Sequence, residues 1–400
     1  MSRSWRLPIL ILFCGSLVLS LNLGIRQSLG LFIPDLMNEK GWSAGTLAFA
    51  FAIQNLVWGL ASPLGGMLAD RWGTAKTLAL GCAVYASGLA LMGMSDSVWM
   101  LHGSAGLLIG AGVGATTFPI VLGAIGRAVP PEKRSFALGI ASAGGSFGQF
   151  IMAPVTQQLN LGFGPETALL LLAAISLLMV PAGLALAGKP EPGQGVGQQS
   201  LTEALREAAG QRSYLLLMAG FFVCGFHVAF ISVHLPVFSA LCGMVPAVAA
   251  TSLALVGLFN IFGTLTTGAL GGRYPKKWLL SGIYFGRAVA IGAFMLAPKT
   301  EASFLIFASV MGFLWLSTVP PTSGLIAQIF GPRYLASLFG LVMLSHQVGA
   351  FLGAWSGGLV YDLTGSYDAV WVAALALGVF AGLVHLPIRE APLQREAVPA

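Results

Sequence analysis

An arginine lies inside a long apolar stretch near the start of the 400-residue chain. The segment LVLSLNLGIRQSLGLFIPDL, residues 17–36, contains Arg26 and is long enough to cross a bilayer. Pro34 and Asp35 mark its predicted outer end, so eight residues of helix place Arg26 about 12 Å below that end. This depth exceeds the reach of the side chain, and burial without a partner costs on the order of 3 kcal/mol. We therefore expect Arg26 to face protein or a water-filled cavity.

A few other polar side chains occur in apolar segments and are candidates to share a site with Arg26. Asn22 lies one helical turn before it, and His227 and His234 lie seven residues apart on about one face of their own segment. No Asp or Glu is expected deep in the membrane, and histidine titrates near neutral pH, so both histidines are candidates for proton coupling. The other candidate substrate-binding residues are Thr116, Thr117, Asn260, His346 and Gln347.

A guanidinium among neutral donors, with no carboxylate nearby, is suited to binding an anion, because it can clamp a carboxylate with two parallel hydrogen bonds. The sequence leaves two roles open for Arg26: contact with substrate, or a structural hub that donates to backbone carbonyls. His227 and His234 are likewise either titrating groups or satisfied structural residues. Arg287, also inside an apolar segment, either pairs with a neighbouring helix or supplies a further contact to the substrate.

The composition predicts a polytopic membrane protein. Hydrophobic residues make up 56% of the chain and charged residues only 8%, whereas soluble domains carry about 25% charged residues. Backbone groups in lipid must pair internally, so long apolar runs should be helices. The twelve predicted spans are Leu7–Ile33, Ala44–Leu68, Thr77–Gly93, Met100–Ile125, Ser135–Leu159, Thr167–Ala187, Tyr214–Leu241, Ala247–Leu270, Trp278–Ala297, Phe304–Ile329, Leu335–Val360 and Val370–Leu386.

The basic residues predict the orientation of these spans. With the N-terminus inside, sixteen Lys and Arg residues fall on the cytoplasmic side and two on the outer side, as the positive-inside rule requires. We expect both termini to be cytoplasmic, in a bacterial inner membrane. The four cysteines form no CxxC pair, so neither a disulfide framework nor a zinc site is indicated. We expect no cofactor, no metal and no nucleic-acid partner, and a monomer in the lipid bilayer.

The chain repeats itself after about 200 residues. GMLADRWGTAKTL at position 66 matches GALGGRYPKKWLL at position 268, and ATTFP, ending at Pro119, matches LSTVP, ending at Pro320. A Pro-, Gly- and Gln-rich interval separates the copies. The predicted organisation is an N-terminal six-helix bundle (1–188), a cytoplasmic linker (189–212) and a C-terminal six-helix bundle (213–400). Two such parallel halves with a site between them near mid-membrane are typical of a transporter.

The loop after the second span carries a family motif. Gly66-Met-Leu-Ala-Asp70-Arg71-Trp-Gly73 resembles the G-x-L-a-D-r-x-G signature of the major facilitator superfamily. The resemblance implies an all-α membrane fold of two pseudo-symmetric six-helix bundles. It also implies a cytoplasmic gate formed by Gly66, Asp70, Arg71 and Gly73, with Arg273 in a weaker second copy. The alternative is a tight turn with a topogenic charge.

Two further stretches resemble a branch of that superfamily. KRSFALGIASAG, from Lys133, resembles the K-R-x-L-A-x-G-x-A-x-A-G pattern of monocarboxylate transporters, and FNIFGT, residues 259–264, is similar to the F-N-x-x-G-R of the oxalate/formate and monocarboxylate group. In that group the final arginine holds a substrate carboxylate, but Thr264 stands there in this chain. The acidic, aromatic-rich motif of the group's first span is also absent.

These observations predict a secondary active transporter, not an enzyme, that moves a small organic anion by alternating access. The anion would be a mono- or dicarboxylate, with proton symport through histidine or through the substrate itself. No HExxH or GxSxG motif indicates a membrane hydrolase. Two alternatives remain: a proton-driven exporter of lipophilic or cationic compounds, and a non-transporting sensor with a transporter fold.

Overall fold

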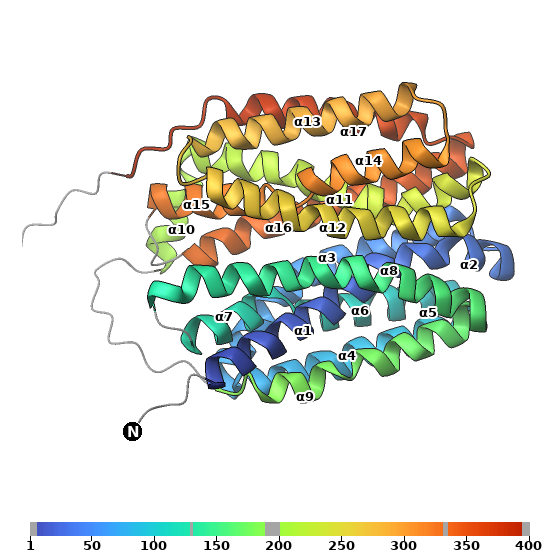
Figure 1. Ribbon diagram of the computed structural model, residues 1–400, viewed down its shortest axis with the longest axis horizontal. Coiled ribbons are helices and arrows are strands. Elements are labelled where there is room, and N and C mark those ends of the chain that lie inside the picture. The colour runs from blue at the N-terminus through green and yellow to red at the C-terminus, as the bar shows by residue number, and fades with distance from the viewer. Residues whose placement is uncertain (1–5, 129–130, 189–200, 331–334, 394–400) are drawn as a thin grey trace, which may run out of the picture.

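The computed structural model describes residues 6–128, 131–188, 201–330 and 335–393, and every regular element in these ranges is a helix (Figure 1). The N-terminal elements are α1 (Arg6–Ser28), η1 (Leu29–Phe32), α2 (Ile33–Lys40), α3 (Ala44–Trp72), α4 (Thr74–Gly93), α5 (Val98–Leu101), η2 (His102–Leu108), α6 (Ile109–Gly114), α7 (Phe118–Ala128), α8 (Pro131–Ser176) and α9 (Met179–Leu184). The later elements are α10 (Leu201–Ala209), α11 (Arg212–Leu241), α12 (Pro246–Leu270), α13 (Lys276–Leu296), α14 (Glu301–Leu314), α15 (Val319–Phe330), α16 (Leu335–Thr364) and α17 (Asp368–His385).

The twelve predicted spans are all present in the described chain. Ten helical stretches are long and apolar enough to cross a membrane. One of them, residues 140–184, contains two spans that turn at Gly164, where φ is 78°. The shorter apolar stretch Val98–Gly114, continued by α7, supplies the remaining span. The first span is longer than predicted, because the chain stays helical through Pro34 as far as Lys40.

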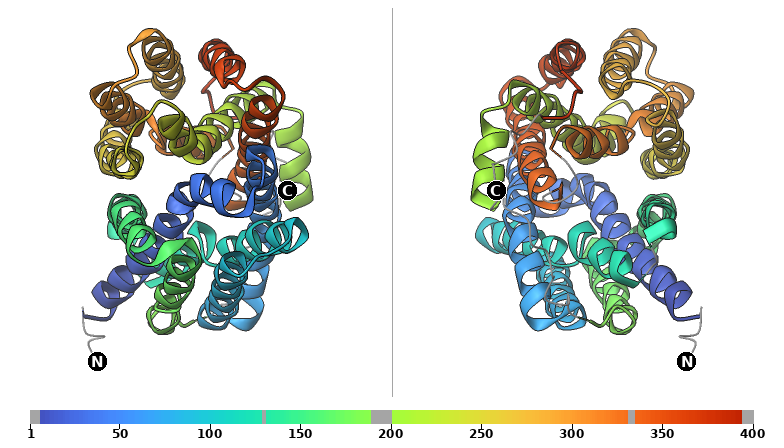
Figure 2. Two further views of the ribbon diagram at one scale, coloured as in Figure 1. Left: turned by 90° about the vertical axis from the view of Figure 1, so that its right-hand side faces the viewer. Right: turned by 90° about the vertical axis from the view of Figure 1, so that its left-hand side faces the viewer.

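The spans form two halves that repeat the same packing. In the N-terminal half α1 packs along α8, and in the C-terminal half α11 packs along α16. The pairs α3–α16 and α8–α12 join the halves, which lie one above the other in Figure 1 and meet in the centre of the end-on views of Figure 2. The predicted bounds of the halves stay a prediction, since residues 189–200 of the linker lie outside the described residues.

Spans four and ten are broken at matching places. The fourth span is interrupted between α6 and α7 at residues 115–117, and the tenth between α14 and α15 at residues 315–318. Each break ends just before the last two residues of a repeated motif, Phe118-Pro119 in the fourth span and Val319-Pro320 in the tenth. A proline disfavours α-helical backbone at the residue before it. Each break frees carbonyl groups that need new partners.

The halves are in close contact at one end of the molecule. We call it the α2 end, because α2 and the turn Gly41–Ser43 that follows it lie there. We call the opposite end, where α10 lies, the α10 end (Figure 1). Near the α2 end a Cβ added to Gly358 of α16 would lie 2.6 Å from Cβ of Ala48 on α3. Towards the α10 end, Gly66 of α3 and Gly340 of α16 face open space. The helices α3 and α16 are therefore tightly packed at the α2 end, whereas these two glycines towards the α10 end make no such close contact.

Candidate functional site

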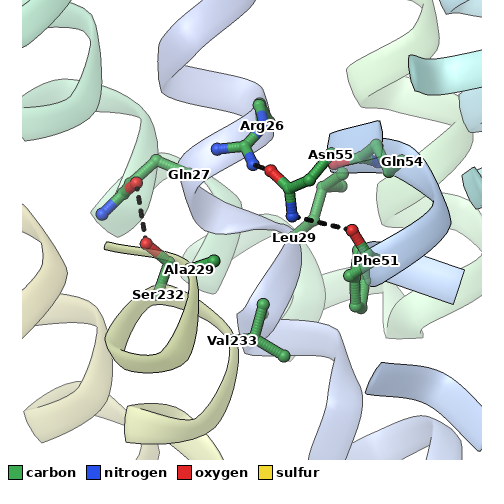
Figure 3. A pocket seen from close by; sticks show the side chains of 10 residues that line it. Arg26, Gln27, Leu29, Phe51, Gln54, Asn55, Ala229, Ser232 and Val233 are labelled. Carbon is green, nitrogen blue, oxygen red and sulfur yellow. Dashed lines mark hydrogen bonds between the residues drawn. The ribbon is translucent and has the colours of Figure 1, made fainter. Parts of the chain in front are cut away.

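Arg26 lies in the last turn of α1, just before the helix tightens into η1 (Figure 3). Its Nη2 donates to Oδ1 of Asn55 on α3. Asn55 in turn donates from Nδ2 to the Phe51 carbonyl, 2.8 Å away, which fixes the amide so that its oxygen faces the guanidinium. The Cζ atom of Arg26 lies 4.6 Å from the ring centroid of Trp58, a cation–π geometry. Asn55 and Trp58 are about one turn apart on α3 and orient the cation together.

A cavity lies beside Arg26 at the interface of the two halves. It is small, with a volume of about 10 Å³, which is about what one water molecule needs. Its wall combines α1, η1 and α3 of one half with α11 of the other. The lining residues are Arg26, Gln27, Leu29, Gly30, Phe51, Gln54, Asn55, Ala229, Ser232 and Val233.

The polar groups of this cavity wall are neutral except for Arg26. The Ser232 hydroxyl lies 3.3 Å from Gln27 Oε1 across the interface (Figure 3). Nε2 of Gln27 and Nε of Arg26 are buried donors without an acceptor in the described part of the chain. Buried donors that lack acceptors are costly. The site therefore offers a positive charge and spare N–H groups, with no carboxylate among its lining residues.

Asn22, Thr116 and Thr117 lie inside the N-terminal half and do not line this cavity. Asn22 Nδ2 donates to Thr116 Oγ1 over 2.5 Å, and Tyr85 donates from its hydroxyl to the Asn22 carbonyl over 3.2 Å. Thr116 also donates to the Gly112 carbonyl, 2.7 Å away. These bonds tie α1 and α4 to the break in the fourth span. Thr117 is buried, and its hydroxyl has no partner among the described residues.

His227 and His234 also lie away from the cavity beside Arg26. The Nε2 atom of His227 lies 2.7 Å from the Ala374 carbonyl of α17. His234 Nε2 lies 2.7 Å from the Ala354 carbonyl of α16, and its Nδ1 lies 3.1 Å from the Tyr367 hydroxyl. Both side chains connect α11 to helices of its own half. His234 has a partner at each ring nitrogen and fits the satisfied structural role, whereas Nδ1 of His227 has no partner among the described residues.

The remaining predicted site residues lie at helix contacts. Asn260 of α12 donates to Ser146 Oγ of α8 over 3.1 Å and accepts from the Leu316 backbone N–H at the break in the tenth span, also over 3.1 Å. His346 and Gln347 of α16 are buried, and their side-chain nitrogen and oxygen atoms have no hydrogen-bond partner in the described region. None of the three lines the cavity beside Arg26.

Arg287 is fully buried and donates to a broken helix. Its Nε lies 3.1 Å and its Nη2 2.8 Å from the Leu314 carbonyl, and Nη2 also donates to the Trp315 carbonyl. These are the carbonyls that the end of α14 leaves without helical partners. A further contact runs from Nη2 to Cys224 Sγ on α11, 3.5 Å away. Of the two roles open to Arg287, the structure supports pairing with a neighbouring helix.

The predicted gate motif is described only in part. Gly73 joins α3 to α4 with φ of 97°, a conformation that side chains disfavour, so this glycine is required by the turn. Gly66 has open space around it, and Arg273 is exposed after α12. The side chains of Asp70 and Arg71 lie outside the described residues, so the gate stays a prediction.

Reasoning from the sequence missed most of the residues around Arg26. Gln27 and Ser232 were not singled out, and neither were three residues of the second span: Gln54, Asn55 and Trp58. The adjacent amides in AFAIQNLVWG were a usable signal, because polar side chains inside an apolar span are rare and face protein or a cavity.

Comparison with known proteins gives a consistent result. The family model described as Major Facilitator Superfamily matches residues 12–321 and 246–399. "Monocarboxylate transporter 11" of Mus musculus is 29% identical over 386 residues (93% of this chain, 85% of the relative), and "Monocarboxylate transporter 13" of Bos taurus is 29% identical over 391 residues (93% and 88%). The solved structure of a D-xylose-proton symporter has a TM-score of 0.78 at 15% identity, covering 98% of this chain and 100% of that one.

Proposed function

Because the chain belongs to the major facilitator superfamily and is a membrane transporter, not an enzyme, we propose that its substrate is a small organic anion, a mono- or dicarboxylate held by Arg26. The observation that carries the proposal is the cavity at the interface of the halves. Its one charged side chain is a guanidinium, and no carboxylate in its wall neutralises that charge.

The surroundings of Arg26 support an anion over a cation. A guanidinium presents five N–H donors in a fixed fork that matches a carboxylate. Asn55 accepts from Nη2 and Trp58 covers one face, so the side chain is held in place while Nε stays without an acceptor. Gln27 adds a neutral donor next to it. A single cation matches a single carboxylate group, which favours a monocarboxylate, the substrate class in the names of the two relatives.

Alternating access gives the cavity its role. Two halves that part at one end and close at the other expose a site between them to each side in turn. The proposal places the termini in the cytoplasm, because that orientation puts sixteen basic residues on the inner side and two on the outer side. The α10 end then faces inward and the tightly packed α2 end faces outward. The cavity has room for only about one water, so the substrate enters when the helices around Arg26 separate further.

Proton coupling is proposed through the substrate's own protonation. His227 and His234 contact backbone carbonyls within the C-terminal half, at a distance from the cavity lining. A carboxylate that carries its proton into the site needs no titrating side chain. The protein is proposed to work as a monomer in a bacterial inner membrane.

Counterflow in proteoliposomes tests the function. Vesicles loaded with unlabelled lactate, oxalate or succinate are expected to accumulate the same labelled anion when they contain the wild-type protein. Counterflow by the Arg26→Gln variant should be at least about 100-fold slower than by the wild type, because the variant lacks two charge-assisted hydrogen bonds to the anion of about 1.5–3 kcal/mol each. Arg206→Gln, at an exposed position of α10, is the matched control and should transport normally.

Two outcomes would contradict the proposal. Uptake of lipophilic cations in place of the anions, unaffected by Arg26→Gln, would support a proton-driven exporter. Anion binding to the purified protein without any flux in vesicles would support a sensor.

A further inference from the structure

Asp362 connects the two halves at the α2 end. It lies near the end of α16, and its Oδ2 accepts from Ser43 Oγ over 2.7 Å and from the Gly45 backbone N–H over 2.9 Å. Ser43 and Gly45 belong to the N-terminal half, where they begin α3. The two bonds therefore link residues more than 300 positions apart.

The partner of Asp362 is the start of a long helix. Ser43 is the N-cap of α3, and its Oγ also accepts from the Thr46 backbone N–H over 3.1 Å. The first N–H groups of a helix lack partners within it, and the partial positive charge there favours an anion. A carboxylate from the other half satisfies one of these groups and completes the cap.

This contact depends on very close packing of α3 and α16. A Cβ added to Gly45 would lie 2.2 Å from Asp362 Oδ2, and a Cβ added to Gly358 would lie 2.8 Å from the Ala44 carbonyl. Both glycines are needed for the helices to come this near. Since the two hydrogen bonds exist only while the helices touch, they stabilise the closed α2 end and are lost when it opens.

We propose that Asp362 is the latch of the α2 end: a positioning residue whose carboxylate caps α3 of the opposite half and so biases the transporter towards the conformation closed at that end. Gating at this end has meaning only for alternating access, so the inference rests on the proposed mode of transport. It does not depend on the identity of the substrate. Opening the α2 end requires that Ser43 and Gly45 release the carboxylate to water.

The test measures the gap between the halves at both ends in the absence of substrate. Spin labels on Glu39→Cys and Thr364→Cys report on the α2 end, and labels on Lys76→Cys and Tyr274→Cys report on the α10 end. All four positions are exposed. Cys14 and Cys242, which are partly exposed, are replaced by serine, whereas Cys82 and Cys224 are buried and stay. Distances are measured by pulsed electron paramagnetic resonance on the full chain in nanodiscs.

In Asp362→Ala the ratio of open to closed molecules at the α2 end should rise about fivefold, and the distance at the α10 end should shorten in the same fraction of molecules. Ser43→Ala should shift the ratio in the same direction by less, because the Gly45 bond remains. Asp96→Ala is the matched control: its carboxylate lies at the same end but pairs with Lys40 within one half, 2.7 Å away. It should leave both distances unchanged.

Unchanged distances in Asp362→Ala would overturn the latch, whether or not the variant is less stable to heat. So would an equal shift in Asp96→Ala. Because no substrate is present in these measurements, their result is separate from the counterflow test: a transporter of some other solute would still show the latch, and an anion transporter without the latch would still show counterflow.

Discussion

Arg26 and Arg287 are two arginines within the membrane-spanning helices, one in each half, and they solve the problem of burial in different ways. Arg287 donates to the Leu314 and Trp315 carbonyls, which are fixed groups of the same half. Arg26 lies at the interface of the halves, where it donates to the Asn55 amide and lies over Trp58. Each arginine also keeps one buried N–H group without an acceptor among the described residues, Nε in Arg26 and Nη1 in Arg287, so the contrast lies in their location and in the partners they do have. The comparison teaches that an intramembrane arginine is not a binding group in itself. In our proposal, the partners and the location of the arginine decide whether it holds the fold or a ligand.

The internal repeat explains the role of Arg287. At the offset of 202 residues, Arg287 corresponds to Tyr85 and Cys224 to Asn22, and at the offset of 201 residues between the ATTFP and LSTVP motifs, Thr318 corresponds to Thr117, the neighbour of Thr116. In the N-terminal half Tyr85 donates to the Asn22 backbone carbonyl, and the Asn22 side chain donates to Thr116. In the C-terminal half Cys224 Sγ lies 3.4 Å from Thr318 Oγ1 and 3.5 Å from Arg287 Nη2. In each half, these three residues connect the first, third and fourth spans of that half at the helix break. Arg287 therefore belongs to a structural contact that is present in both halves.

Removal of Arg287 is expected to have the largest effect on stability. Arg287→Met leaves the carbonyls at the end of α14 unpaired, at about 1–3 kcal/mol per group. We predict a loss of about 3 kcal/mol in unfolding free energy, seen as a lower midpoint in thermal denaturation of the detergent-solubilised protein. Anion binding by the protein that remains folded should be retained. A variant as stable as the wild type that no longer binds anions would contradict the assignment.

Substitution of Trp58 tests the proposed binding role of Arg26. Trp58→Leu removes the aromatic ring that lies beside Arg26 but keeps an apolar side chain at the same position of α3. Cation–π contacts contribute about 0.5–2 kcal/mol, so the Kd for the transported anion should rise by about 2- to 30-fold, measured by titration calorimetry. The matched control is Trp278→Leu, at an exposed position of α13, which should bind as the wild type does. An unchanged Kd in Trp58→Leu would remove Trp58 from the site.

Tyr85 tests the structural contact in the N-terminal half. Tyr85→Phe deletes only the hydroxyl that donates to the Asn22 carbonyl. We predict a loss of about 1 kcal/mol in unfolding free energy, since one buried hydrogen bond is lost. The effect should be smaller than that of Arg287→Met because a single hydrogen bond is lost and the Asn22 carbonyl still lies within the helical turn of α1. Equal losses of unfolding free energy in the two variants would contradict this ranking.

Substitution of the two histidines is expected to have the smallest effect on transport and on its coupling to protons. His227→Gln and His234→Gln should keep the wild-type dependence of transport on pH between 5 and 8, because both side chains contact backbone carbonyls away from the cavity. A lower thermal stability is expected in both. Loss of pH dependence in either variant would restore the proton-coupling role that the sequence suggested.

The sequence predicted the spans, the repeat and the position of Arg26, because length, hydropathy and an isolated charge are local properties. It did not predict the helix breaks, although the repeated ATTFP and LSTVP motifs end at them. Nor did it identify Asn55 and Trp58 as partners of Arg26. Their contact depends on the rotation and depth of α3 relative to α1, which follow from packing between helices and not from the pattern within either one.

The histidines illustrate the same limit from the opposite side. A spacing of seven residues correctly placed His227 and His234 on about one face of α11, but it could not say whether that face meets the cavity or the helices α16 and α17. Arg287 was left open for a similar reason: its acceptors are main-chain atoms that become free only because the tenth span breaks.

The most direct test of the account is a thermal-shift titration of the purified protein with lactate, oxalate and succinate, carried out in parallel on the wild type, Arg26→Gln and Arg206→Gln. The account predicts that at least one of these anions raises the denaturation midpoint of the wild type and of Arg206→Gln, and that Arg26→Gln shows no such rise. If the anions stabilise Arg26→Gln as much as the wild type, or if tetraphenylphosphonium stabilises all three proteins while the anions stabilise none, Arg26 is not the anion site.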